Sequence, residues 1–273
     1  MMARSSSVEA LEILLFSHNL EYAAAAVAAG VSAIVVDWEW SGKSVRQSGW
    51  NTQISRGNET DLVAMRQCVA GTVICRINNQ PGQRVQELRR AAELGADEVL
   101  LPMVRSVADV EECLAALPSH CSLGILAETA EALQLAEQWA QLPLSRIYVG
   151  LNDLQIDTGR ATLFSALCDG VVEAFRRRYE GAFGFAGVTH PDLGRPVPCR
   201  LLLAEMARQS CSFAVARRSF RADVPQADLS RAVHAIRTCY AELRQRDART
   251  VAADYEQLCA HVMRLTSGEA SRS

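Results

Sequence analysis

Aromatic side chains are scarce in this chain of 273 residues, and it contains no long apolar run. Aromatic residues make up 6% of the chain, whereas hydrophobic residues as a whole make up 49%. The most apolar stretch covers residues 22–36 and is interrupted by Gly30 and Ser32. A helix that crosses a bilayer needs roughly 20 apolar residues, so this stretch predicts a helix end followed by a strand, and no membrane partner.

A surplus of basic residues and an export signal are also missing. The formal net charge is -3 and the pI is about 6.0, whereas domains that bind nucleic acid normally carry a basic face. The opening segment, MMARSSSVEALEILLF, has no apolar core followed by a small-residue cleavage site. We therefore expect a cytoplasmic protein whose partners are small molecules and not nucleic acid.

The chain has nine cysteines, but no pair of them has the C-x-x-C spacing of a zinc or redox motif. Most of the nine fall in apolar helix or strand contexts, which favours buried free thiols. None of them has an evident base or stabilising cation beside it in the sequence, so a cysteine nucleophile is not favoured.

The chain does contain a regular alternation of short apolar runs with helical patterns. The runs are rich in Val, Ile and Leu and show no consistent period of two, which is typical of parallel strands buried on both faces. The predicted strands are residues 13–17, 32–40, 72–78, 98–104, 123–129, 146–154, 183–189 and 213–220. The predicted helices are residues 20–29, 59–70, 82–94, 106–117, 130–140, 160–178 and 199–209, with further helices to about 265.

Eight such units in roughly 250 residues match an α/β fold of the (β/α)8 TIM-barrel type. The alternative is a doubly wound open sheet, which typically has fewer strands and a G-x-G-x-x-G turn after the first. No such turn follows residues 13–17. We expect a single TIM-barrel domain over 1–273, with the barrel at about 10–225 and additional C-terminal helices at about 226–265.

Polar residues cluster where the predicted strands end. In a TIM barrel these ends form the active-site face. The residues at these positions are His18, Asp37, Glu39, Arg76, Asn78, Glu128, Asn152, Asp153, His190, Arg217 and Arg218.

Glu128 and Asp153 lie near the C-terminal ends of two neighbouring predicted strands, 123–129 and 146–154, at matching heights. Adjacent strands lie about 4.8 Å apart, so two carboxylates there would repel unless they shared a cation or one took up a proton. Two carboxylates completed by water or substrate oxygens suit Mg²⁺ or Mn²⁺. The alternative is a pair of independently solvated carboxylates.

Arg76 follows the apolar residues of the segment VICRIN. An unpaired buried guanidinium is costly, so this side chain needs an anion. A substrate carboxylate or an enolate oxygen would suit its planar fork. The alternative is a salt bridge to Glu39 or to another acid at the same end of the barrel.

Several segments together resemble the family of 4-hydroxy-2-oxo-acid aldolases and citrate lyase β-subunits, which are metal-dependent TIM barrels of the phosphoenolpyruvate/pyruvate type. They are VVDWEW, VICRIN, GADEVLLPMVRSVADVEE, ILAETAEAL and VGLNDLQIDTG, in order within about residues 10–220. The resemblance implies that Glu128 and Asp153 hold Mg²⁺ or Mn²⁺ and that Arg76 steadies an enolate. It also implies a homo-oligomer, a trimer or a hexamer.

One position departs from the aldolase branch of that family. The aldolases carry D-x-E-H after the second strand, with the histidine as acid or base, whereas this chain has Trp40 at the end of Asp37-Trp38-Glu39-Trp40. The citrate lyase β branch also lacks this histidine and often has a lysine and an arginine shortly afterwards. Lys43 and Arg46 are similar to that pair.

His18 and His190, which stand at predicted strand ends, are alternative acids or bases, because a histidine pKa suits proton transfer near neutral pH. His190 precedes Pro191 and also fits a simple turn. We expect Asp37 and Glu39 to organise water or to orient Arg76.

These features predict a divalent-metal-dependent carbon–carbon lyase or synthase of aldol or Claisen type. It would act through a metal-bound enolate of a small 2-oxo acid or an acyl-CoA, and condensation of oxaloacetate with acetyl-CoA to citrate is one such reaction. The predicted catalytic residues are Arg76, Asp37, Glu39, His18 and His190. The predicted substrate-binding residues are Arg76, Asn78, Lys43, Arg46 and Asn152. The alternatives are an acyl-CoA thioester hydrolase and a non-catalytic protein that binds metal and oxo acid.

Overall fold

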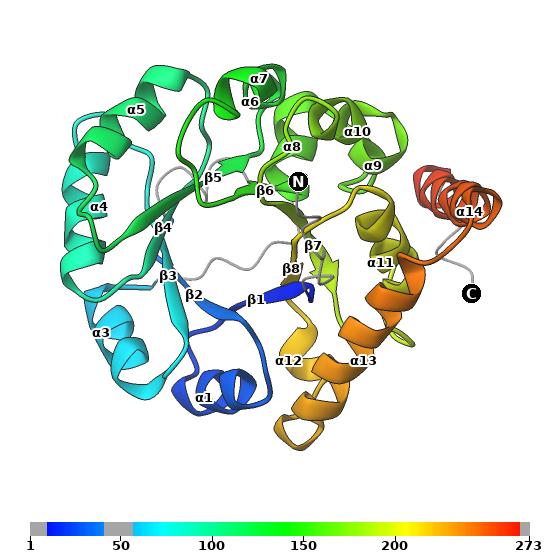
Figure 1. Ribbon diagram of the computed structural model, residues 1–273, viewed down its shortest axis with the longest axis horizontal. Helices are drawn as coiled ribbons and strands as arrows, with labels where there is room; N and C mark the ends of the chain where they lie inside the picture. Colours follow the sequence, from blue (N-terminus) through cyan, green and yellow to red (C-terminus); the bar gives the residue numbers. More distant parts are fainter. Residues whose placement is uncertain (1–9, 41–56, 268–273) are drawn as a thin grey trace, which may run out of the picture.

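Eight parallel strands close into a barrel in a computed structural model that describes residues 10–40 and 57–267 (Figure 1). The strands follow one another around the barrel in chain order, and the eighth pairs with the first. This arrangement confirms the predicted (β/α)8 fold. Within the described residues, no helix has the length and apolar character that crossing a membrane requires.

The strands are short and the helices between them vary in length. The strands are β1 (Glu12–Phe16), β2 (Ala33–Asp37), β3 (Thr72–Arg76), β4 (Glu98–Leu101), β5 (Ser122–Ala127), β6 (Ile147–Val149), β7 (Phe183–Val188) and β8 (Phe213–Ala216). The helices up to β7 are α1 (Leu20–Ala28), α3 (Glu59–Cys68), α4 (Arg84–Glu93), α5 (Val107–Ala116), α6 (Ala130–Gln134), α7 (Ala136–Trp139), α8 (Leu151–Thr158), α9 (Ser165–Cys168) and α10 (Val171–Arg176). The later helices are α11 (Cys199–Arg208), α12 (Phe220–Asp223), the 3₁₀ turn η1 (Gln226–Asp228), α13 (Leu229–Leu243) and α14 (Ala248–Thr266).

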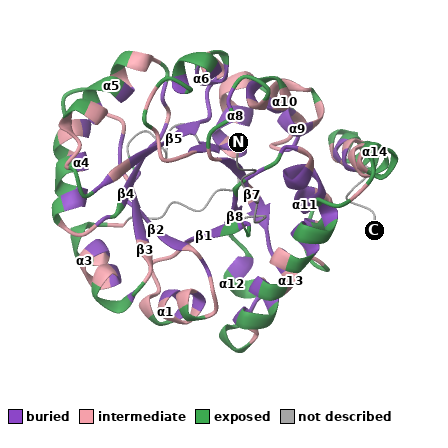
Figure 2. Ribbon diagram, in the orientation of Figure 1, coloured by how far each residue is buried: buried purple, intermediate pink, exposed green. Residues whose placement is uncertain are grey.

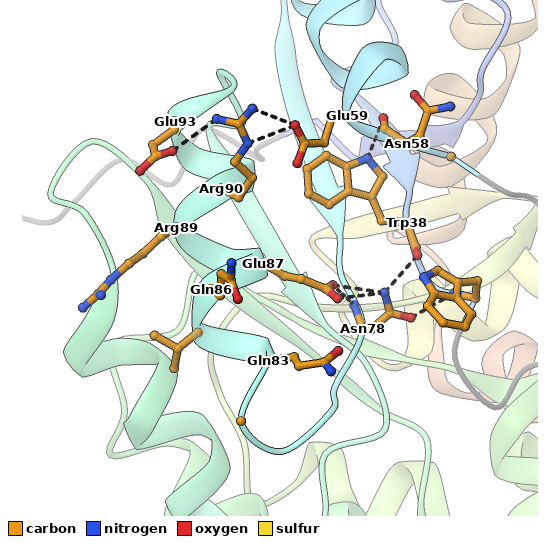
Figure 3. A pocket seen from close by; sticks show the side chains of 14 residues that line it. Trp38, Asn58, Glu59, Asn78, Gln83, Gln86, Glu87, Arg89, Arg90 and Glu93 are labelled. Atoms are coloured by element: carbon orange, nitrogen blue, oxygen red, sulfur yellow. Dashed lines mark hydrogen bonds and ion pairs between the residues drawn. The ribbon is translucent and has the colours of Figure 1, made fainter.

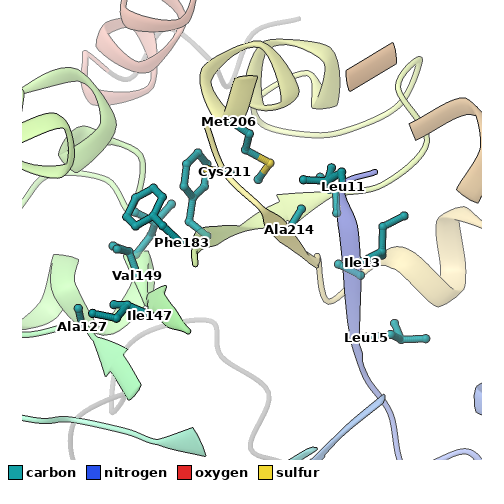
Figure 4. Close-up of a cluster of buried hydrophobic side chains, with 14 of the residues drawn as sticks. Leu11, Ile13, Leu15, Ala127, Ile147, Val149, Phe183, Met206, Cys211 and Ala214 are labelled. Atoms are coloured by element: carbon teal, nitrogen blue, oxygen red, sulfur yellow. The ribbon is translucent and has the colours of Figure 1, made fainter. Parts of the chain in front are cut away.

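Each strand contributes to two separate apolar cores, because successive side chains point to opposite faces of a sheet. The larger core lies between the barrel and the helices, and Figure 4 shows part of it, including Ile13, Ile147, Val149 and Phe183. The smaller core fills the inside of the barrel. It contains Leu14, Ala33, Val35, Ile74, Leu100, Leu126, Tyr148, Phe213 and Val215. Figure 2 shows the resulting pattern, with buried residues along the strands and exposed residues on the outer sides of the helices.

The same alternation brings polar residues to the inside of the barrel at the C-terminal ends of the strands. Asp37 and Arg76 lie two residues beyond the inward-facing Val35 and Ile74, and they are partners in the β2–β3 register. Glu128 lies two residues beyond the inward-facing Leu126. Residues far apart in the chain therefore meet at one mouth of the barrel.

The prediction for residues 146–154 as one strand was wrong at its C-terminal end. β6 ends at Val149, and Asn152 and Asp153 lie in the first turn of α8 instead of at the end of the strand. Gly150 separates the two elements and forms the N-cap of the helix. Asp153 therefore sits where a carboxylate is favoured by the positive end of the helix dipole.

The predicted helix 160–178 was also wrong. Within these residues the chain forms α9 and α10, with Gly170 between them at a φ of 83°, and Gly159 at a φ of 66° ends α8 just before them. Glycine adopts this left-handed conformation without the steric cost that other residues meet, so each glycine ends or separates a helix. Residues 160–178 therefore contain two short helices instead of one long helix.

The two C-terminal helices pack on the barrel's own helical layer. α13 and α14 both contact α11 (Figure 1). The apolar stripe of α13 that the sequence shows, Leu229, Val233, Ile236 and Tyr240, is buried within the chain. Packing within the chain thus accounts for this stripe.

Candidate active site

Arg76 is held by two carboxylates at the mouth of the barrel. Its Nε and Nη2 donate hydrogen bonds of 2.9 and 2.7 Å to the two carboxylate oxygens of Asp37. Its Nη1 lies 3.2 Å from Oε2 of Glu39, and its guanidinium lies 4.9 Å from the centre of the Phe16 ring. The guanidinium is fixed in orientation, which is one of the two roles expected for Asp37 and Glu39.

These partners keep Arg76 charged although it is buried. Burial by itself would lower the pKa of Arg76, but the charges of Asp37 and Glu39 raise it well above its usual value. A bidentate arginine–carboxylate pair is also stronger and more directional than a single neutral hydrogen bond. The site therefore contains a permanent, oriented cation.

Glu128 is placed beside this cation by contacts from two other segments. It follows β5, is 2% exposed, and its Oε1 accepts a hydrogen bond of 2.8 Å from the backbone N–H of Met103. Met103 adopts a φ of 50°, an unusual backbone conformation for a residue other than glycine. Gly150 leaves the space for the carboxylate, since a Cβ atom there would lie 2.2 Å from Oε2 of Glu128.

The surroundings of Glu128 disfavour a negative charge on its carboxyl group. Burial and then the charges of Asp153 and Glu39 raise the pKa of Glu128 well above its usual value. Arg76 and the N–H of Met103 oppose this only in part. A carboxyl group in such a place either takes up a proton or requires a further cation.

The donor set fits a hard divalent cation. Glu128 and Asp153 are buried carboxylates that interact electrostatically, and Mg²⁺ is commonly held by one or two carboxylates, with water and substrate oxygens filling the other positions. Residues 10–40 and 57–267 contain no group of three or more His, Cys, Asp or Glu side chains arranged to hold a metal. A metal ion bound by Glu128 and Asp153 would therefore need oxygen atoms of water or substrate at its other coordination positions.

Asn78 connects two loops next to the site. Its Oδ1 accepts a hydrogen bond of 3.0 Å from the backbone N–H of Trp40, and its Nδ2 donates one of 3.2 Å to the carbonyl of Trp38. Its amide groups also bind the carboxylate of Glu87 on α4 (Figure 3). These bonds hold the segment that follows β2 in place, whereas substrate binding was the role predicted for Asn78.

A cleft beside α4 shares Trp38 and Asn78 with the edge of the site (Figure 3). It is lined also by the start of α3 and by Trp40, whose side chain is 60% exposed. Glu128 and Asp153 do not line it.

The remaining predicted residues lie in different surroundings. Asn152 is half-buried in α8, and its Nδ2 has no hydrogen-bond partner in the described part of the chain. His190 lies in a turn after β7, where its Nδ1 is 3.6 Å from the exposed carboxylate of Asp192. Lys43 and Arg46 lie outside the described residues.

His18 lies near the C-terminal end of β2, which carries Asp37. A Cβ atom built on Gly57 would lie 2.5 Å from Cε1 of His18 and 2.3 Å from the carbonyl oxygen of Asp37, so both approach the same glycine. The Nδ1 of His18 is 3.9 Å from the carboxylate of Asp61. Both ring nitrogens are buried without a hydrogen-bond partner among the described residues.

Tyr148 was missed in the sequence. It lies on β6, points into the barrel, and interacts electrostatically with Arg76, Glu128 and Asp153. The sequence could have indicated it, because Tyr148 stands two residues after Arg146, the polar residue at the start of the same apolar run. This spacing places both side chains on one face of a strand.

The comparisons with known proteins show the fold and not the chemistry. No protein-family model and no curated protein matches the chain. Among solved structures, a crystal structure of RipC from Yersinia pestis is similar, with a TM-score of 0.51 and 16% sequence identity. The similarity covers 88% of this chain and 98% of RipC. At this identity the comparison supports the barrel architecture alone.

Proposed function

We propose that the protein is a divalent-metal-dependent carbon–carbon lyase or synthase that acts through the enolate of a small 2-oxo acid or an acyl-CoA. The observation that carries the proposal is the buried carboxylate of Glu128 at the mouth of the barrel, where it interacts with Asp153 and with an arginine that Asp37 and Glu39 hold in place. Perturbed carboxyl groups of this kind at the C-terminal end of a TIM barrel are typical of active sites. The resemblance of the sequence to the aldolase and citrate lyase β-subunit family points to the same chemistry.

Glu128 and Asp153 would hold Mg²⁺ or Mn²⁺, which when bound supplies Lewis-acid polarisation of a carbonyl group. The rest of the catalytic work falls to the side chains of the chain. When the carbon–carbon bond breaks, its electron pair remains on the oxo-acid fragment and negative charge develops on the enolate oxygen. Arg76 is already charged and oriented, so it stabilises this oxygen without reorganisation during the reaction.

Cleavage also requires that a proton leaves the substrate hydroxyl and that a proton reaches the enolate carbon. In the proposal His18 performs the first transfer, because its ring approaches the end of β2 that carries Asp37. His190 is less suited, since it lies beside Asp192 in a turn that is partly exposed. Trp40, at the position of the aldolase histidine, has no group that transfers a proton at neutral pH.

Product analysis tests the proposal directly. Purified protein with Mg²⁺ is incubated with oxaloacetate, pyruvate and acetyl-CoA, singly and in pairs, and the products are identified by mass. Glu128→Gln and Asp153→Asn should each lower turnover at least about 100-fold, because losing even an outer-shell partner of a metal site costs 10–100-fold. Glu131→Gln, an exposed acid on α6 paired with Arg105, is the control and should retain activity. Undiminished turnover in the two site variants would refute the proposal.

Two alternatives use the same residues. A non-catalytic protein that binds metal and oxo acid is favoured by Trp40, which stands where the aldolase branch has its histidine. It predicts binding of Mg²⁺ and oxo acid without turnover of any candidate. A thioester hydrolase would instead release free CoA from acetyl-CoA in the absence of an oxo acid, so the same product analysis separates the three.

Assembly into a trimer or hexamer is part of the proposal that comes from the family resemblance alone. Sedimentation-velocity ultracentrifugation would distinguish these states from a monomer of 29.8 kDa.

A further inference from the structure

Tyr148 is the inward-facing residue of β6 in the middle of the barrel. Its register partners are Leu126 on β5 and Gly184 on β7. It belongs to the core inside the barrel, next to the partly buried Phe16 and Ala186. Its side chain is therefore enclosed by the barrel wall and directed away from the helices.

The neighbouring strand β7 carries small residues on the face that it shares with Tyr148. Gly184 has no side chain, and a Cβ atom there would lie 2.1 Å from the carbonyl oxygen of Phe213. Ala186, the next inward-facing position on β7, carries only a methyl group. Tyr148 thus shares the inside of the barrel with small residues on β7 and with two other aromatic side chains, Phe213 and the partly buried Phe16.

The hydroxyl of Tyr148 has no hydrogen-bond partner in the part of the chain that the structure describes, although the residue is only 9% exposed. Two other buried tyrosines differ in this respect. The hydroxyl of Tyr22 donates a hydrogen bond of 2.8 Å to the carbonyl of Val224, and that of Tyr240 donates one to the carbonyl of Cys211. The Tyr148 oxygen is not among the described side-chain atoms that are both fully buried and unpaired, so it is accessible to a further partner, which can be water or a ligand.

The environment of the phenol locates this partner at the mouth of the barrel. Tyr148 interacts electrostatically with Arg76, Glu128, Arg218 and Asp153. Arg218 is exposed, follows β8, and has no ion pair or hydrogen bond within the described ranges 10–40 and 57–267. A tyrosine phenol is protonated at neutral pH, so the group can donate a hydrogen bond.

We propose that the phenol of Tyr148 contacts the substrate and donates a hydrogen bond to an oxygen of the oxo acid or its enolate. β4 and β5 separate β3 from β6 in the barrel, so Tyr148 and Arg76 approach the ligand from different sides. No bond to the phenol forms or breaks, and its proton stays on the tyrosine. The inference rests on the proposed function, because it requires an anionic oxo acid in this mouth.

Binding of oxalate tests the inference without turnover. Oxalate is a planar dianion that mimics the enolate of pyruvate. Calorimetry measures first the affinity of the protein for Mn²⁺, and then its affinity for oxalate at saturating Mn²⁺. The variant is Tyr148→Phe, which keeps the ring and removes only the hydroxyl. The matched control is Tyr22→Phe, which removes a hydroxyl whose partner is a backbone carbonyl outside the site.

Tyr148→Phe should bind Mn²⁺ within about twofold of the unaltered protein and oxalate about tenfold more weakly, a change that corresponds to about 1.4 kcal/mol. Tyr22→Phe should leave both affinities unchanged. Equal oxalate affinity in Tyr148→Phe and the unaltered protein overturns the role of Tyr148 and leaves the metal site intact. Failure of the unaltered protein to bind Mn²⁺ overturns the proposed function, and the inference with it.

Discussion

At the scale of single residues, the charged side chains of the site differ in whether a group of opposite charge balances them. Arg76 has two acids within contact distance, and its charge is balanced by Asp37 and Glu39. Glu128 has one backbone donor, from Met103, and is otherwise dominated by burial and by other carboxylates. The arginine is the stable part of the site, and the glutamate is the part that destabilises the metal-free protein.

This difference predicts a pH-dependent stability for the metal-free protein. A carboxyl group whose pKa is raised on folding stabilises the fold at low pH. That contribution is lost as the pH rises from the unfolded value, about 4.3, through the raised native value. Glu128→Gln keeps the position neutral at every pH, so its gain in stability over the unaltered protein should grow with pH. Melting temperatures in EDTA at pH 5 and pH 8 measure this, at about 2–4 °C for each kcal/mol gained.

Two further observations would check the cause. With excess Mg²⁺ at pH 8 the order should reverse, because the cation stabilises only the charged glutamate. If the metal-free Glu128→Gln variant melts below the unaltered protein at pH 8, other groups of the protein already stabilise the charged Glu128 carboxylate.

At the scale of secondary-structure elements, the join between β6 and α8 positions the acid pair. Gly150 ends the strand, forms the N-cap of the helix, and lies against Glu128. Its φ of −83° is accessible to other residues, so the requirement for glycine comes from the close approach of the Glu128 carboxylate and not from the backbone. The join therefore sets the position of Glu128 as well as that of Asp153.

Gly150→Ala should displace Glu128 and lower the affinity for Mn²⁺ by about 10–100-fold, as expected when a supporting contact of a metal site is lost. Isothermal titration calorimetry measures this change. Gly124→Ala is the matched control, because a Cβ atom there would lie 2.7 Å from Oε1 of Glu98, a buried glutamate at the other end of the barrel. The control should lower stability and leave the Mn²⁺ affinity unchanged. Equal Mn²⁺ affinities for Gly150→Ala and the unaltered protein would show that the site tolerates this movement.

At the scale of the whole molecule, the barrel has a polar layer at each end and an apolar core between them. At the N-terminal end of the strands, the Nε of Arg146 donates a hydrogen bond of 2.9 Å to Oε1 of Glu98, and its Nη1 donates one of 2.8 Å to Glu12. The guanidinium lies 5.1 Å from the centre of the Phe213 ring. This layer satisfies its own charges, which is consistent with a role in stability at that end of the barrel.

Arg146→Met should lower the free energy of unfolding by about 3–5 kcal/mol, because it leaves the buried carboxylate of Glu98 without its cation. Urea unfolding followed by circular dichroism measures the loss. The affinity for Mn²⁺ should not change, since the substitution is at the opposite end of the barrel. Arg105→Met, which removes a more exposed arginine paired with Glu131 and Asp157, should cost much less. A similar loss in both variants would show that burial of the Arg146 pair is not decisive.

Local patterns in the sequence were sufficient to predict the architecture. The apolar runs and the helical patterns between them depend on neighbouring residues, and they predicted eight βα units and a closed barrel. The acid residues and Arg76 were identified because charge inside or directly after an apolar run is costly without a partner. Helix boundaries were less accurate where glycine interrupts a continuous pattern, as at Gly170.

The sequence by itself thus determined the fold class and the set of charged residues at the mouth of the barrel, because both follow from short-range periodicity. Only the tertiary structure decided which of these residues meet. Asp37 and Arg76 are 39 positions apart, and Met103 and Glu128 are 25 apart. The direction of Tyr148 into the barrel and the place of Asp153 on a helix likewise depend on strand register and on where β6 ends. Such contacts arise from closure of the barrel, which no local segment specifies alone.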